Sequence, residues 1–103
     1  MLNYIEEHLH EPITLKKMSA FLGQHEKYLG RKFLKETNYT VKKYVLLKKI
    51  QEAKKELLFS NHTLEETAMN LGFASQSHFT QTFKEYTGLT PRKYINSRAF
   101  YLY

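Results

Sequence analysis

The 103-residue sequence predicts an all-α protein of about seven helices, organised as two helix-turn-helix units joined by a long linker helix. Three observations predict this fold class. One motif occurs twice along the chain, a continuous amphipathic segment separates the two copies, and Gly and Pro are rare. The composition, with 42% hydrophobic and 15% aromatic residues, is typical of a globular protein rather than a disordered one.

The repeated motif indicates how the chain is organised. Residues 14–23 align with residues 63–72 at an offset of 49, and residues 29–45 align with residues 79–95 at an offset of 50. Two separated copies do not make a solenoid, which needs about three adjacent repeats. We therefore predict one domain over residues 1–103, with a first unit at 1–40, a linker helix at 41–59 and a second unit at 60–103.

The first helix of each unit is predicted from its ends. Thr63 and Glu66 have the spacing of a capping box, and Gly72 stands where a left-handed residue ends a helix. The first copy has the corresponding Thr14 and a corresponding glycine, but Lys17 replaces the glutamate of the box. The first copy is therefore expected to be less well capped.

The second helix of each unit is predicted from apolar pairs at i, i+4 spacing. These pairs are expected to lie in the core rather than on a ligand-binding surface: Leu29 and Phe33, and Phe79 and Phe83. Both helices should end near residues that tolerate positive φ, Asn38 and Gly88.

The linker helix is predicted because residues 41–58 contain neither Gly nor Pro and place apolar residues near helical spacing. At about 1.5 Å per residue, 18 residues span about 27 Å, which is comparable to the ~34 Å of one turn of DNA. Its lysine pairs spread around the helix, so we interpret them as a solvated surface in preference to a track of phosphate contacts.

Short helices are expected at both ends of the chain. Residues 2–10 should form one that stops before Pro12, and Thr90-Pro91 should begin another that reaches about Arg98. Three apolar residues of the N-terminal helix are predicted to be buried: Leu2, Ile5 and Leu9.

The charge favours a polyanionic partner. The formal net charge is +6, and residues 1–59 carry 12 basic and 7 acidic side chains against 4 and 3 in residues 60–103. The absence of cysteine, of a signal peptide and of any apolar stretch long enough to span a membrane predicts a cytoplasmic protein with no membrane partner.

Composition and motifs also argue against catalysis. The chain has no Cys and no Asp, and it contains neither a glycine-rich phosphate loop nor a Ser/His/Asp signature. Four histidines lack metal-ligand spacing and are expected to be exposed: His8, His10, His25 and His62. We predict a protein that is not an enzyme and binds no metal or cofactor.

The apolar pairs orient the second helices and so identify their outward residues. In the first unit these are Lys27, Gly30, Arg31 and Lys35, and in the second they are Gln76, Ser77, Thr80, Gln81 and Lys84. Arg binds guanine O6 and N7, and Gln binds adenine N6 and N7, so Arg31 and Gln81 are the best candidates to contact bases. The alternative is that both are ordinary solvated side chains. His78 is a candidate contact to a base or phosphate, or else a partly buried structural histidine.

The sequence then resembles a known family. The run Leu71–Lys84, followed by Thr87–Tyr94, is similar to the C-terminal signature of the AraC/XylS family of bacterial transcription regulators. Leu29–Phe33 and the pattern Ile50-x-x-Ala53-x-x-x-Leu57-Leu58 resemble the rest of that domain. The resemblance covers roughly residues 4–97.

The resemblance implies two recognition helices in adjacent major grooves of promoter DNA, with double-stranded DNA and RNA polymerase as partners. It implies base contacts at Lys27, Gly30, Arg31, Ser77, His78 and Gln81. The outward position of Gln76 and Thr80 on the second helix adds them to the expected base contacts, and that of Lys35 adds it to the expected phosphate contacts. The resemblance implies further phosphate contacts at Ser75, Lys84 and Arg92.

Three positions depart from the family pattern. Gly30 stands where the family usually has a side chain, so one base contact is expected to be missing. Lys49 stands where the family usually has Arg, which implies a weaker buried salt bridge because Lys lacks the bidentate fork. Gln81 replaces an Arg often found in the second unit, which shifts the expected preference from guanine towards adenine.

An alternative function is a helical module that binds a protein or an acidic surface through the basic amphipathic helix at 41–58. That alternative gives no reason for the repeat. Family members usually carry a separate effector-sensing domain, which is absent from this chain, so we expect either a short regulator or the C-terminal part of a longer one.

Overall fold

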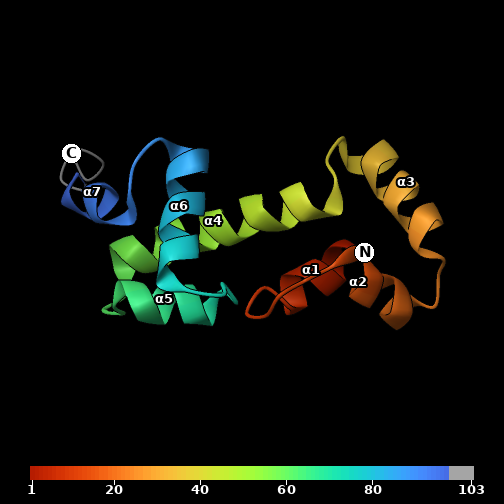
Figure 1. Cartoon of the computed structure of the whole chain (residues 1–103), viewed down its shortest axis with the longest axis horizontal. Helices are drawn as coiled ribbons and strands as arrows, with labels where there is room; N and C mark the ends of the chain where they lie inside the picture. The colour runs from red at the N-terminus through yellow and green to blue at the C-terminus, as the bar shows by residue number, and fades with distance from the viewer. Residues whose placement is uncertain (98–103) are drawn as a thin grey trace.

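Helix α4 (Val41–Phe59) forms the axis of the molecule, and the other helices pack at its two ends (Figure 1). The computed structural model describes residues 1–97, which contain seven helices and no strand. Around the first end lie α1 (Leu2–Glu7), α2 (Leu15–Leu22) and α3 (Glu26–Thr37), and around the second lie α5 (Leu64–Asn70), α6 (Gln76–Thr87) and α7 (Pro91–Asn96). The all-α prediction with about seven helices is confirmed.

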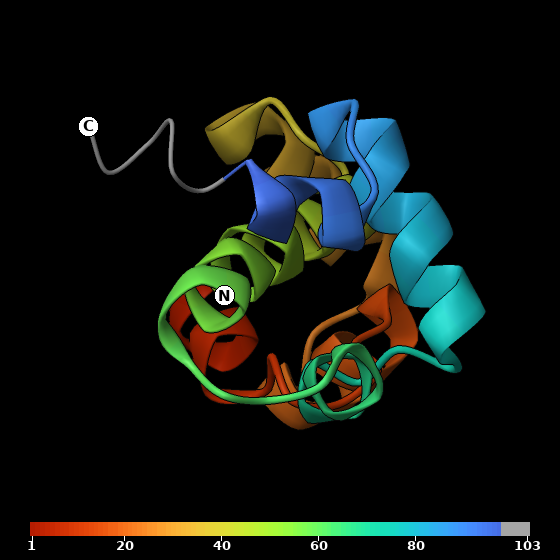
Figure 2. The same cartoon turned by 90° about the vertical axis from the view of Figure 1, so that its left-hand side faces the viewer.

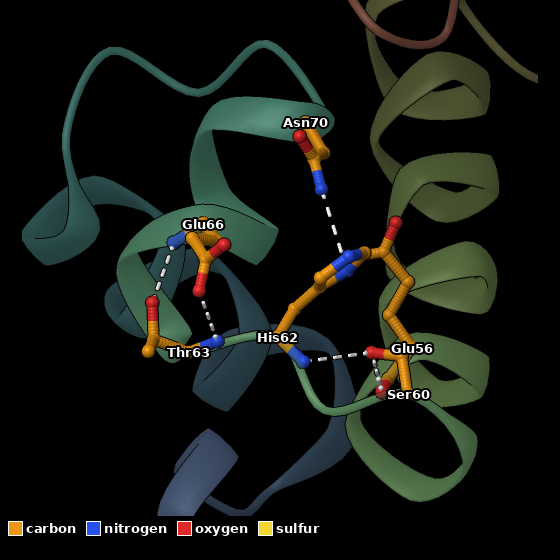
Figure 3. Close-up of polar contacts among 6 residues, drawn as sticks. All are labelled: Glu56, Ser60, His62, Thr63, Glu66 and Asn70. Atoms are coloured by element: carbon orange, nitrogen blue, oxygen red, sulfur yellow. Dashed lines mark hydrogen bonds and ion pairs between the residues drawn. The ribbon is translucent and has the colours of Figure 1, made fainter.

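The helix ends follow the local signals in the sequence. Figure 3 shows the capping box of α5, in which the Glu66 N–H donates to Thr63 Oγ1 at 3.1 Å and the Thr63 N–H donates to Glu66 Oε1 at 3.0 Å. These hydrogen bonds lower the pKa of Glu66, with the bond from the Thr63 backbone contributing most. Thr14 caps α2 by accepting from the Lys17 N–H, without a return bond. The predicted difference between the two copies is confirmed.

Helix α5 is also tied to the end of α4 by side chains. The Nδ1 atom of His62 lies 3.6 Å from Glu56 Oε2 and 3.5 Å from Asn70 Nδ2. Figure 3 shows the His62 side chain between these two residues. Glu56 belongs to α4 and Asn70 to α5, so His62 connects the second unit to its end of the linker helix.

Two hydrophobic cores divide α4 between them. Val41 and Val45 pack into the first core with α1, α2 and α3, whereas Ile50, Ala53 and Leu57 pack into the second with α5, α6 and α7. The predicted core residues of the recognition units are at most 1% exposed: Leu29, Phe33, Phe79 and Phe83. The buried apolar residues of α4 are thus used in these two cores, whereas Leu47, Leu58 and the 77% exposed Phe59 belong to neither.

The N-terminal segment corrects two predictions. Helix α1 ends at Glu7 rather than residue 10, because the chain turns there and the Glu11 N–H donates to the His8 carbonyl before Pro12. Leu2 is 46% exposed, and Tyr4 takes its place in the core beside the predicted Ile5 and Leu9.

Histidine exposure is predicted correctly at three of four positions. His10, His25 and His62 are exposed, and His25 caps α3 by accepting from the Lys27 N–H. His8 is half-buried, because its ring stacks on Tyr4 at 4.1 Å and its Nδ1 lies 2.7 Å from the Tyr4 carbonyl oxygen. At the C-terminus α7 ends at Asn96, and Arg98 lies outside the described residues.

Candidate nucleic-acid interface

The two recognition helices, α3 and α6, lie on the same side of α4 near opposite ends of the molecule. In Figure 1 both run upward, and in Figure 2, which looks along the molecule, one lies behind the other. Each is preceded by a tight turn containing a left-handed glycine, Gly23 with φ 65° and Gly72 with φ 72°. The fold therefore presents two similar helices to one side.

The first recognition helix has a basic outer face. Lys27, Arg31 and Lys35 are all exposed, as predicted from the burial of Leu29 and Phe33. Tyr28, Lys32 and Glu36 join Arg31 and Lys35 around a shallow depression on this face. Tyr28 and Lys32 were not predicted to belong to this surface. A signal for Tyr28 was present, because Tyr28, Arg31 and Lys35 have the i, i+3, i+7 spacing that places residues on one face of a helix.

Gly30 lies at the edge of this face rather than at its centre. A Cβ atom built there would lie 3.0 Å from a terminal methyl carbon of Leu15, so the position faces α2 as much as solvent. Its counterpart Thr80 is also half-buried. Gly30 therefore stands beside the contact between α2 and α3.

The second recognition helix has a polar outer face with less charge. Gln76, Ser77, Gln81 and Lys84 are exposed, and together with Thr80 and Thr90 they line one depression. Thr90, which caps α7, was not predicted as part of this surface. The structure thus brings together the five outward residues proposed for α6.

The remaining predicted residues flank α6. Ser75 is exposed and its hydroxyl accepts from the His78 N–H at 3.0 Å, so it caps the recognition helix. The His78 side chain is exposed rather than partly buried, and its ring lies edge-on to Phe73 at 5.4 Å. Arg92 is exposed on α7, and both Ser75 and Arg92 are free of the hydrophobic core.

Lys49 is the one charged residue buried among residues 1–97, and its partners differ from those expected. Its ammonium donates to the backbone carbonyls of Glu11, at 2.7 Å, and Leu71, at 2.5 Å. The buried salt bridge implied by the family resemblance is therefore replaced by two carbonyl contacts. Burial lowers the pKa of Lys49 from 10.5 to about 8, and the negative charge of Glu11 offsets part of this shift.

The lowered pKa predicts an unusual dependence of stability on pH. Between about pH 8 and 10.5 the unfolded chain holds a proton on Lys49 that the folded chain has released, so rising pH favours the folded state. From pH 7 to pH 9, the free energy of unfolding should rise by about 1 kcal/mol relative to a Lys49→Met variant. Urea denaturation at several pH values measures this difference, and Lys48→Met, altered at the neighbouring half-buried lysine, should follow the wild type. A constant difference between wild type and Lys49→Met would contradict the prediction.

Within residues 1–97, neither a metal site nor a membrane-spanning helix is found. No group of three or more His, Cys, Asp or Glu side chains there is arranged to hold a metal ion. No helix within residues 1–97 has both the length and the apolar character needed to cross a bilayer.

Comparison with known proteins gives a consistent result. Residues 18–97 match a family described as a helix-turn-helix domain. An uncharacterized HTH-type transcriptional regulator of Staphylococcus aureus strain MSSA476 is 32% identical over 96 residues, which are 93% of this chain and 13% of that protein. The chain thus spans only a small part of the length of such relatives. The multiple antibiotic resistance protein MarA of Salmonella typhimurium is 36% identical over 94 residues, covering 91% of this chain and 74% of MarA.

Solved structures show the same fold. The C-terminal domain of the two-component response regulator yesN from Fusobacterium nucleatum is 32% identical, with a TM-score of 0.87 over 91% of this chain and 92% of that domain. The DNA-binding domain of the global transcriptional factor AdpA, determined in complex with a target DNA, has a TM-score of 0.89 at 23% identity and covers 95% of this chain and 89% of its own. At that identity the likeness shows the fold.

Proposed function

Because this chain belongs to the AraC/XylS family of DNA-binding transcription regulators, we propose that it recognises a promoter through two helices placed in adjacent major grooves of double-stranded DNA. The observation that carries the proposal is the position of α3 and α6 on one side of the molecule with exposed polar faces (Figure 2). The complex of AdpA with its target DNA supports double-stranded DNA as the ligand of this fold.

The chemistry of the exposed side chains indicates which of them contact bases and which contact phosphates. Arg31 and Gln81 are the principal base contacts, one on each recognition helix, because their side chains match guanine and adenine edges. The other proposed base contacts are Lys27, Gly30, Gln76, Ser77, His78 and Thr80. The proposed phosphate contacts are Lys35, Ser75, Lys84 and Arg92. The units at 1–40 and 60–103 each contribute one recognition helix, joined by the 41–59 helix.

Other parts of the proposal concern the cellular role. The protein acts in the cytoplasm, without catalytic activity, and contacts RNA polymerase when it regulates transcription. The family membership supports these statements, and the high share of basic residues in the first half supports electrostatic attraction to DNA.

Alanine substitutions should separate the two kinds of contact. Arg31→Ala and Gln81→Ala should each weaken binding to the best site by about 1–3 kcal/mol and relax preference at one or two base pairs. Lys84→Ala and Arg92→Ala should weaken binding similarly on every sequence and reduce the salt slope by about one unit. Affinities measured on a selected site and a scrambled site at several salt concentrations give both quantities.

A matched control removes a positive charge outside the recognition helices. Lys55 on α4 is exposed and pairs with Glu52, so Lys55→Ala should change neither the base preference nor the affinity by as much as the recognition-helix variants. If Arg31→Ala weakened the selected and scrambled sites equally, Arg31 would be a phosphate contact, and sequence discrimination would rest on α6 around Gln81.

A further inference from the structure

Residues of both units meet around the buried Lys49 on the linker helix. Lys49 extends from the centre of α4 and bonds the Glu11 carbonyl in the segment before α2 and the Leu71 carbonyl in the turn before α6. These two carbonyls belong to different units, and they are 38 and 22 residues away from Lys49 along the chain. One ammonium group therefore contacts both units at once.

The backbones of the two units also touch beside this lysine. A Cβ atom built on Gly72 would lie 2.5 Å from the carbonyl carbon of Glu11, 2.7 Å from its Cα and 2.9 Å from its nitrogen. Only a residue without a side chain permits this approach. The contact brings the turn before α6 directly against the segment before α2, where the Lys49 bonds converge.

The surroundings leave Lys49 little freedom. Its ammonium lies 5.8 Å from the centre of the Phe73 ring, and the residue as a whole is 4% exposed. A small cavity of about 160 Å³ adjoins it, lined in part by Ile13, Leu46 and His78. An ammonium with three donors on a long stem is suited to bond two carbonyls that approach from different directions.

We propose that Lys49 is a positioning residue that sets the placement of α6 relative to α3 by joining the Glu11 and Leu71 carbonyls. The consequence for DNA rests on the proposed function: two recognition helices held in a fixed arrangement should favour one spacing between the two half-sites of a DNA site. Loss of the ammonium leaves each unit with its own core, because Lys49 belongs to neither hydrophobic cluster. It removes the polar link between the units.

The arrangement can be measured without DNA. The chain has no cysteine, so Glu36→Cys on α3 and Glu85→Cys on α6 introduce two spin labels at positions on the recognition helices. Pulsed electron spin resonance should give a narrow distance distribution for the otherwise unchanged chain. Lys49→Met should broaden the distribution or shift its maximum, and Lys49→Arg, which keeps the donors, should restore it at least in part.

The matched control is Lys48→Met. Lys48 is adjacent on α4 but pairs with Glu6 of α1, within the first unit, so its loss should leave the distance distribution unchanged. If Lys49→Met does not fold by circular dichroism, Lys49→Gln replaces it, since its shorter side chain keeps donors but does not reach both carbonyls. An unchanged distribution in the folded variant would overturn the proposal.

The consequence for DNA is tested with paired sites. Wild type should bind a site with two half-sites far more tightly than one with either half scrambled, because the second contact is intramolecular. Lys49→Met should reduce this ratio by about tenfold while changing the affinity for a single half-site by no more than about twofold. Equal ratios for wild type and Lys49→Met would refute the positioning role. Failure of every variant to bind DNA would instead contradict the proposed function, and the spin-label distances would still decide the inference.

Discussion

Phe33→Ala and Phe83→Ala are each expected to lower the free energy of unfolding by about 3–5 kcal/mol, because each removes a large ring and leaves a cavity. Both side chains are fully buried. The Phe33 ring meets Tyr44 of α4 at 5.3 Å, and the Phe83 ring meets Phe79 at 5.8 Å and Tyr94 at 5.4 Å. Each variant therefore loses contacts that hold a recognition helix to its own core.

Urea denaturation followed by circular dichroism measures these losses. Leu34 follows Phe33 on α3 but is 48% exposed, so Leu34→Ala should change stability by only about 0.5 kcal/mol. Stabilities close to wild type for both phenylalanine variants would mean that the buried faces of α3 and α6 are wrongly assigned.

Gly72→Ala is expected to lower the free energy of unfolding by about 2–5 kcal/mol, the sum of left-handed strain and overpacking. Gly72 has φ 72°, and an added Cβ would overlap the Glu11 backbone, which cannot rotate away as a side chain would. The new methyl group would force the two units apart.

Gly23→Ala is the matched control for this variant. Gly23 has φ 65° and occupies the corresponding turn of the first unit, but nothing lies within 4 Å of the point where its Cβ atom would be added. Its replacement should cost only the left-handed strain, about 1–2 kcal/mol. Equal losses of unfolding free energy in the two variants would show that the Glu11 contact is not a constraint on the fold.

Much of the fold could be predicted because its signals are local. The i, i+4 spacing of Phe79 and Phe83 identifies the buried face of α6, and the cap at Thr63 with its partner Glu66 identifies the start of α5. The repeat allows each interpretation in one unit to be checked against the other. The exposed candidates on α3 and α6 follow directly from these buried faces.

The contacts between the units could not be predicted because they join residues distant in sequence. Gly72 is fully explained as a helix stop, so nothing in the sequence indicates that its missing side chain also admits the Glu11 backbone. The family resemblance implies a salt-bridge partner for Lys49, whereas backbone carbonyls, which every residue has, leave no sequence signal. The early end of α1 has a different origin: it depends on the turn in which the Glu11 N–H donates to the His8 carbonyl.

The difference between the outer faces of α3 and α6 gives the molecule a polarity. A two-fold symmetric dimer presents the same surface after it is turned end for end on a duplex, which is why such dimers suit palindromes. This chain has no such axis: α3 contributes a basic face with Lys27, Arg31 and Lys35, whereas α6 contributes Gln76, Ser77 and Gln81. Under the proposed function, reversing the chain on its site would exchange two different surfaces. Binding would therefore mark upstream and downstream on the DNA as well as position.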